Sequence, residues 1–113
     1  MKTSIIKIGQ NKFDCLIAEN DEEKSTGLMY ISPPPPIMLF PYKRAENCNF
    51  WMKNTPSPLD ILFCSNNTIH TIKEGKPYST EIIKGGQSDL VIELPKGYVK
   101  IYNINVGDKV ELW

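Results

Sequence analysis

Apolar residues occur along this chain in short runs that are separated by Gly, Pro, Asn and Ser. The runs are rich in Ile, Val, Phe and Leu, a composition and length that predict β-strands. They cover residues 4–8, 12–18, 36–40, 49–53, 59–64, 68–73, 89–94 and 109–113. Turns are expected at Asn11, Asn66–Asn67, Gly85–Gly86 and Gly107–Asp108. Regularly spaced short strands of this kind are typical of an antiparallel sandwich or barrel.

Helical signals are confined to two segments. In residues 20–27 (NDEEKSTG), Asn20 can cap the first amides, Glu23 follows three residues later as in a capping box, and Gly27 suits the end of the helix. Residues 98–104 have the β-branched and aromatic content of a strand, but Pro95 and Gly97 before them suit a turn into a short helix. Both readings of this second segment stay open.

The predicted fold class is therefore mainly β. We expect a single domain over residues 1–113, an antiparallel β-sandwich or cradle-like barrel of seven to nine strands with one or two short helices.

Charge and composition exclude several classes of protein. The chain has 13 Lys plus Arg and 13 Asp plus Glu, so it lacks the cationic surplus that displaces counterions from nucleic acid. No run approaches the roughly 18–20 apolar residues of a membrane span, and residues 1–10 lack the long apolar region of a secretory signal. We therefore expect a cytoplasmic protein with no nucleic-acid or membrane partner.

The metal-ligating and nucleophilic side chains are sparse. Cys15, Cys48 and Cys64 are far apart in sequence, and His70 is the only histidine. Structural zinc sites normally use closely spaced ligand pairs, and no third group suggests a Cys–His nucleophile. We expect free thiols, no metal and no cofactor, with His70 at a surface or strand edge.

The densest segment is residues 50–63 (FWMKNTPSPLDILF), where apolar residues enclose a few polar ones. Pro56 and Pro58 predict an extended corner between two strands, and Asn54 and Thr55 can bond the backbone there. Trp51 can form the stacking floor of a small-ligand pocket, or it can pack in the core.

Two carboxylates are embedded in apolar strands, Asp60 and Glu93. If their strands are neighbours, they can form a general acid/base pair like that of glycosidases. They can equally serve as buried acceptors for backbone amides, Lys53, Asn54 or Thr55.

We favour a non-catalytic binding module of unknown ligand, a small molecule or peptide, at a groove around residues 50–63. The alternative is a small hydrolase-like enzyme that uses Asp60 and Glu93. The candidate site residues are Trp51, Asn54, Thr55, Asp60 and Glu93.

The segment FWMKNTPSPLDILF resembles the signature of the domain of unknown function 192 family, a group of small β-rich proteins. Further similar segments follow the family's order: GLMY at 27–30, MLF at 38–40, VIEL with PKG at 91–97, and VGD at 106–108. The resemblance covers residues 15–113 and implies a β-sandwich or cradle-like barrel, with no activity attached. The chain differs from the family in having Pro36 and Ile37 where a Gly usually precedes MLF, and Lys24, Ser25 and Thr26 in place of an Arg-rich stretch.

A run of four prolines, Pro33, Pro34, Pro35 and Pro36, is the one low-complexity feature. Four prolines favour polyproline II, which can dock into an aromatic groove of a protein partner. The same run can also be a stiff surface loop between the helix and the next strand.

Overall fold

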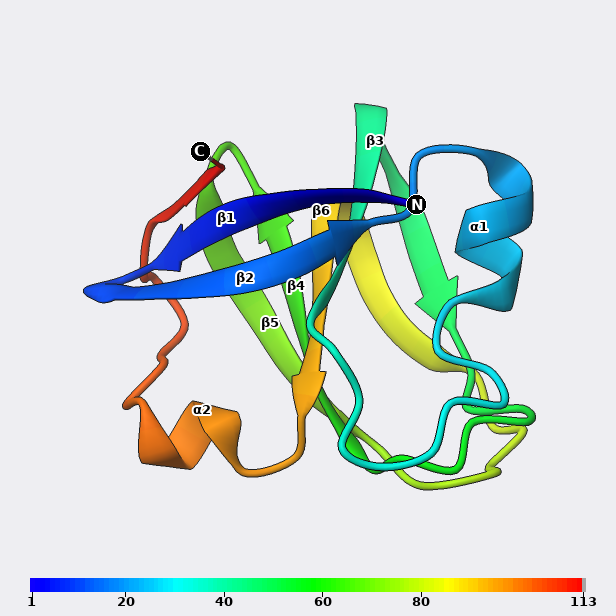
Figure 1. Cartoon of the computed structure of the whole chain (residues 1–113). Coiled ribbons are helices and arrows are strands. Elements are labelled where there is room, and N and C mark those ends of the chain that lie inside the picture. The colour runs from blue at the N-terminus through cyan, green and yellow to red at the C-terminus, as the bar shows by residue number, and fades with distance from the viewer. Residues whose placement is uncertain (113) are drawn as a thin grey trace.

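The computed structural model describes residues 1–112 and contains seven strands and two short helices. In chain order they are β1 (Lys2–Ile8), β2 (Asn11–Ile17), α1 (Asp21–Thr26), β3 (Met38–Phe50), β4 (Leu59–Ser65), β5 (Thr68–Gly75), β6 (Ile83–Pro95), α2 (Tyr98–Ile101) and β7 (Val110–Leu112). All seven strands form one curled sheet in the order β5-β4-β6-β3-β2-β1-β7 (Figure 1). The mainly β fold with two short helices is confirmed, and a half-barrel rather than a sandwich is formed.

The sheet departs from the predicted antiparallel pattern where β2 meets β3. These two strands pair in parallel through Leu16 with Met38 and Ile17 with Leu39. The parallel pairing follows from the long connection between them, which contains α1 and the proline run and returns the chain to the same end of the sheet.

Two strand boundaries were also wrong. Residues 49–53 do not form a separate strand, because β3 continues from Met38 to Phe50 and the chain then turns. Gly85 and Gly86 are not a turn between elements but lie within the 13-residue β6. A Cβ at Gly85 would collide with the ring of Phe63, so glycine there lets the strand run beneath an aromatic ring.

The two edges of the curled sheet approach each other at one end. Thr68, at the start of β5, forms an isolated bridge with Lys109, immediately before β7. The Ile69 amide donates to the Asp108 carbonyl at 3.0 Å, and the Val110 amide donates to the Asn67 carbonyl at 2.9 Å. These bonds satisfy edge groups that would otherwise be open to another chain.

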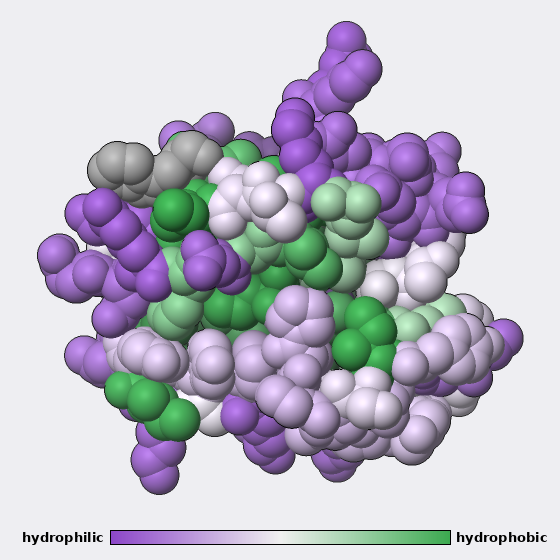
Figure 2. Space-filling model, viewed as in Figure 1, coloured by the Kyte–Doolittle hydropathy of each residue, from purple (hydrophilic) through white to green (hydrophobic). Residues whose placement is uncertain are grey.

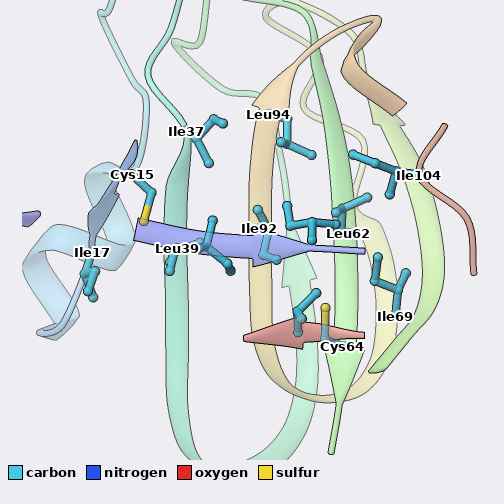
Figure 3. Packing of buried hydrophobic residues seen from close by; sticks show 13 residues of the cluster. Cys15, Ile17, Ile37, Leu39, Leu62, Cys64, Ile69, Ile92, Leu94 and Ile104 are labelled. Atoms are coloured by element: carbon cyan, nitrogen blue, oxygen red, sulfur yellow. The ribbon is translucent and has the colours of Figure 1, made fainter. Parts of the chain in front are cut away.

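Buried side chains form two clusters, one on each face of the central strands. The cluster that we call the barrel core lies inside the curl and contains Ile6, Ile8, Cys15, Ile17, Ile37, Leu39, Leu62, Cys64, Ile69, Ile92, Leu94, Ile104 and Val110 (Figure 3). The outer core lies on the opposite face and contains Ala18, Leu28, Met38, Phe40, Cys48, Met52, Leu59, Ile61, Phe63 and Val91. Because both faces are covered, every residue of β4 from Leu59 to Cys64 is buried.

The two short helices lie far apart, α1 at the upper right and α2 at the lower left of Figure 1. In α1 the Glu23 amide donates to Asn20 Oδ1 at 2.8 Å and the Glu23 carboxylate accepts in return, so the predicted capping box is confirmed. The ambiguous segment after Gly97 is the helix α2, not a strand. In Figure 2 polar side chains cover the α1 region, whereas apolar side chains gather in the middle of the same face. Within residues 1–112 no helix is both long and apolar enough to cross a bilayer.

Candidate functional site

The corner between β3 and β4, residues 51–58, is fastened to two neighbouring loops. The Tyr30 amide donates to the Asn54 carbonyl at 2.8 Å, and Asn54 Nδ2 donates to the Tyr30 hydroxyl at 2.9 Å. The Thr55 carbonyl accepts from the Tyr78 amide at 3.0 Å. Asn54 has φ 57°, a left-handed conformation that asparagine tolerates better than most residues. The corner therefore presents a fixed backbone to the space beside it.

A cleft of about 680 Å³ opens between this corner, α1 and β3. Its apolar walls include Leu28, Phe40, Phe50 and Trp51. The Phe40 and Phe50 rings meet edge to face, with centroids 5.0 Å apart, and this contact fixes the orientation of both. Packed aromatic walls beside a rigid backbone make the cleft preformed, as small-molecule sites usually are.

Glu93 is the acidic side chain at the floor of the cleft. It lies on β6, is only 4% exposed and lines the cleft. Within residues 1–112 no hydrogen bond or ion pair reaches its carboxyl group. Burial raises its pKa from the ordinary 4.5 to about 8, because the charged form loses its hydration. At neutral pH the group is therefore largely a neutral acid that can both donate and accept a hydrogen bond.

Two of the aromatic residues that line the cleft, Tyr42 and Trp51, each have a lysine over the ring. Lys24 Nζ on α1 lies 4.2 Å from the centroid of the Tyr42 ring, and Lys53 Nζ lies 5.2 Å from that of Trp51. Both separations are within the range of cation–π attraction. Burial is the largest of the causes that raise the pKa of the Tyr42 hydroxyl, with Cys48, Glu46 and Glu93 adding to it, so this group is a neutral donor at neutral pH.

Asp60 belongs to the other face of the sheet. It is 5% exposed, and its Oδ2 accepts from the amides of Gly97 at 3.0 Å and Val99 at 3.1 Å. These amides lie at the start of α2, where the backbone has no intrahelical acceptors for them. Asp60 thus fastens α2 to β4, as a buried acceptor for nearby amides.

The carboxylate pair required by the hydrolase alternative is not formed. β4 and β6 are neighbours, but Ile61, not Asp60, stands opposite Glu93, and Asp60 stands opposite Leu94. Since successive side chains of a strand point to opposite faces, Asp60 lies on the barrel-core side and Glu93 on the outer side. The two groups cannot act together on one substrate in one cleft.

The five predicted site residues therefore separate into three groups. Trp51, Thr55 and Glu93 line the cleft. Asn54 does not line it and shapes the corner through Tyr30. Asp60 lies on the opposite face of the sheet. The prediction missed Lys24, Phe40 and Tyr42, which come from α1 and β3. Residues 27–30 and 38–40 stood out only as segments with a family resemblance, and nothing in their spacing showed that they face residues 50–55.

The cysteines and the proline run lie away from this cleft. The three cysteines are buried and free; in Figure 3 Cys15 and Cys64 stand among aliphatic side chains at different ends of the barrel core. Among residues 1–112 no three His, Cys, Asp or Glu side chains are grouped as metal ligands. Pro35 is buried, whereas Pro33 and Pro34 are exposed. The run is therefore not a free polyproline helix along its whole length, and a protein partner there stays a prediction.

His70 is half-buried on β5, and its two ring nitrogens lie 2.8 Å from the Thr71 hydroxyl and 3.1 Å from the Ser88 hydroxyl. These contacts connect its imidazole to one hydroxyl of its own strand and to one hydroxyl of β6.

Comparison with known proteins agrees with the architecture. A crystal structure from Sinorhizobium meliloti 1021, described as a candidate transcription regulator, is similar with TM-score 0.91 and 30% identity, over 98% of this chain and 94% of that one. A protein of unknown function from Novosphingobium aromaticivorans DSM 12444 is similar with TM-score 0.88 and 26% identity, over 98% of this chain and 85% of the other. No curated protein matches the sequence. The sequence model of DUF192 (Uncharacterized ACR) matches residues 4–112, and the chain therefore belongs to the domain of unknown function 192 family.

Proposed function

We propose that this protein is a non-catalytic binding module that holds a small organic molecule in the cleft between α1, β3 and residues 51–55. The observation that carries the proposal is the carboxyl group of Glu93, which is buried at the floor of an aromatic-lined cleft without a partner in the described chain. Burying a polar group without a hydrogen bond costs on the order of 1–3 kcal/mol. A ligand that bonds this group would recover that cost.

Glu93 differs in this respect from the other buried polar residues. Thr55, Ser57, Asp60 and Ser88 are each buried with a hydrogen bond to the backbone. Within residues 1–112 no fully enclosed side-chain oxygen or nitrogen lacks a partner, so the Glu93 carboxyl group, which has no partner there, is not fully enclosed, and Glu93 lines the cleft. An occupant of the cleft could therefore form a hydrogen bond with this group.

The Sinorhizobium protein is described as a candidate transcription regulator. For this chain we favour a small ligand over direct nucleic-acid binding, because the 13 basic and 13 acidic residues cancel. The cytoplasmic location expected from the sequence stays part of the proposal.

A fragment screen observed by ¹H–¹⁵N NMR tests the proposal. We expect bound fragments to shift the amide signals of Leu28, Phe40, Phe50 and Thr55, which surround the cleft. Ser25 is an exposed residue of α1 that lines the cleft, so S25W should fill the space and abolish these shifts. Glu22, on the same helix and exposed, does not line the cleft, and E22W is the matched control. Fragments that bind only elsewhere, or that ignore S25W, would contradict the proposal.

A further inference from the structure

We propose that the occupant of this cleft carries a positively charged amino or guanidinium group that pairs with Glu93 between the aromatic walls. This inference rests on the proposed function and specifies the chemical class of its ligand. It follows from three features of the cleft: the direction in which the buried acid opens, the rings around it, and the distribution of charge among its neighbours.

The ring faces around the cleft already attract cations. Lys24 and Lys53 each hold an ammonium group over a ring, Tyr42 and Trp51 respectively, although both lysines could extend into solvent instead. Tyr42, Trp51, Phe40 and Phe50 all line the same space. Aromatic walls around a buried acid are a suitable environment for an organic cation, because the ring faces and the carboxylate are both negative.

The protein itself supplies no counter-charge to the Glu93 carboxyl group. The titratable side chains that line the cleft together with it are Asp21 and Lys24 from α1 and Tyr42 from β3. Glu46 and Cys48 act electrostatically on the Tyr42 hydroxyl, and Lys53 lies over the Trp51 ring. On β4 the outer-core neighbours Leu59, Ile61 and Phe63 are apolar. Lys24 does not lower the pKa of Glu93, because loss of hydration is the only cause that acts on the pKa of this group. A cationic ligand would supply the missing partner.

Pairing with a cation displaces one proton from the protein. A neutral Glu93 carboxylic acid and an ammonium ligand form a carboxylate–ammonium pair, and the carboxylic proton passes to the solvent. With the free acid titrating near pH 8, affinity should rise between pH 6 and pH 8 by on the order of tenfold or more. An alkylammonium group stays charged over this range, because amines of this kind titrate near pH 10. A neutral ligand that accepts a hydrogen bond from the protonated carboxylic acid would show the opposite trend, because it binds the form that is lost as the pH rises.

A matched pair of probes tests the charge requirement. Benzylamine and benzyl alcohol have the same aromatic body and differ in the charge of the head group. Ligand-observed NMR titrations are made at pH 6, 7 and 8. At pH 8 benzylamine should bind at least about tenfold more tightly than benzyl alcohol, and the affinity for benzylamine should fall toward pH 6. Calorimetry at pH 7 in two buffers of different ionisation enthalpy should detect close to one proton released for each benzylamine bound.

Two variants assign the effect to one carboxyl group. E93Q keeps the shape of the side chain but cannot form the ion pair, so benzylamine should bind at least about tenfold more weakly and without pH dependence. E111Q changes an exposed glutamate of β7, outside the cleft, and should leave the titration unchanged. Thermal melts of both variants verify that the fold is retained.

The possible failures are distinguishable. If benzyl alcohol binds in the cleft as tightly as benzylamine, or if E93Q binds benzylamine as the wild type does, the requirement for a cation is wrong and the cleft remains a ligand site. If neither probe nor any screened fragment occupies the cleft, the proposed function itself fails.

Discussion

Asp60 and Glu93 lie on paired strands at adjacent positions of the register, yet their surroundings are opposite. Asp60 is on the barrel-core side and accepts hydrogen bonds from two amides of the chain. Glu93 is on the outer side, has no partner within residues 1–112 and faces a cleft. Both are nearly inaccessible, at 5% and 4% exposure. Burial alone therefore does not assign a role to a carboxylate. The presence or absence of donors around it does.

The largest effect expected from this contrast is the loss of Asp60. D60A removes the acceptor of the Gly97 and Val99 amides, so we expect it to lower the free energy of unfolding by about 2–4 kcal/mol. Urea denaturation followed by circular dichroism measures the change.

Asp108 provides a matched control for this variant. Its carboxylate accepts from one amide, that of Asn105 at 2.8 Å, and is half-buried. D108A should therefore destabilise the protein less than D60A. Equal losses of stability in the two variants, or a D60A protein that melts within a degree or two of the wild type, would show that Asp60 does not stabilise the fold as proposed.

A somewhat smaller effect should appear at Glu93 as a dependence of stability on pH. Its pKa is raised in the folded protein from the ordinary 4.5 to about 8, so between these values the folded state holds a proton that the unfolded state has lost. The stabilising contribution is complete below pH 4.5 and declines as the pH rises toward 8.

From pH 6 to pH 8 this decline should be about 2 kcal/mol in the wild type and absent in E93Q. Denaturation curves at pH 6, 7 and 8 give the free energy of unfolding of both proteins. The other titrating groups contribute equally to the two proteins, so the difference between them reports Glu93 alone. Parallel curves would mean that Glu93 is ionised in the fold and has a partner in the chain.

The thiols sharpen the comparison further, because they lie on both faces. Cys15 and Cys64 are in the barrel core and Cys48 is in the outer core. Burial raises the pKa of all three, that of Cys64 to about 12. We expect a thiol reagent at pH 8 to find three free groups after unfolding without reductant, and almost none in the native protein. Rapid native labelling of Cys48 alone would show that the outer face opens. Fewer than three thiols after unfolding would reveal a disulfide.

The smallest expected effect is the response to nucleic acid. Titration with single- and double-stranded oligonucleotides at low and physiological salt should show no binding at micromolar concentration, because the basic and acidic residues balance. Tight binding with a steep salt dependence would show that the protein has a functional surface other than the Glu93 cleft.

Local chemistry in the sequence was sufficient for many of these features. The capping box of α1 was predictable because Asn20 and Glu23 contact each other within one helical turn. The alternation along β4 was predictable because successive side chains point to opposite faces, which separates Ile61 from Asp60. The burial of Asp60 followed from a carboxylate set in an apolar run.

The tertiary structure alone decided which strands meet and in what register. A register in which Ile61, not Asp60, stands opposite Glu93 separates the two carboxylates, and a shift of one residue would have reversed that outcome. The cleft likewise depends on contacts between segments far apart in the chain, such as Lys24 above Tyr42 and the Asn54 corner fastened to Tyr30. Short-range propensities carry no information on such distant pairings, because they are set by the packing of the whole sheet.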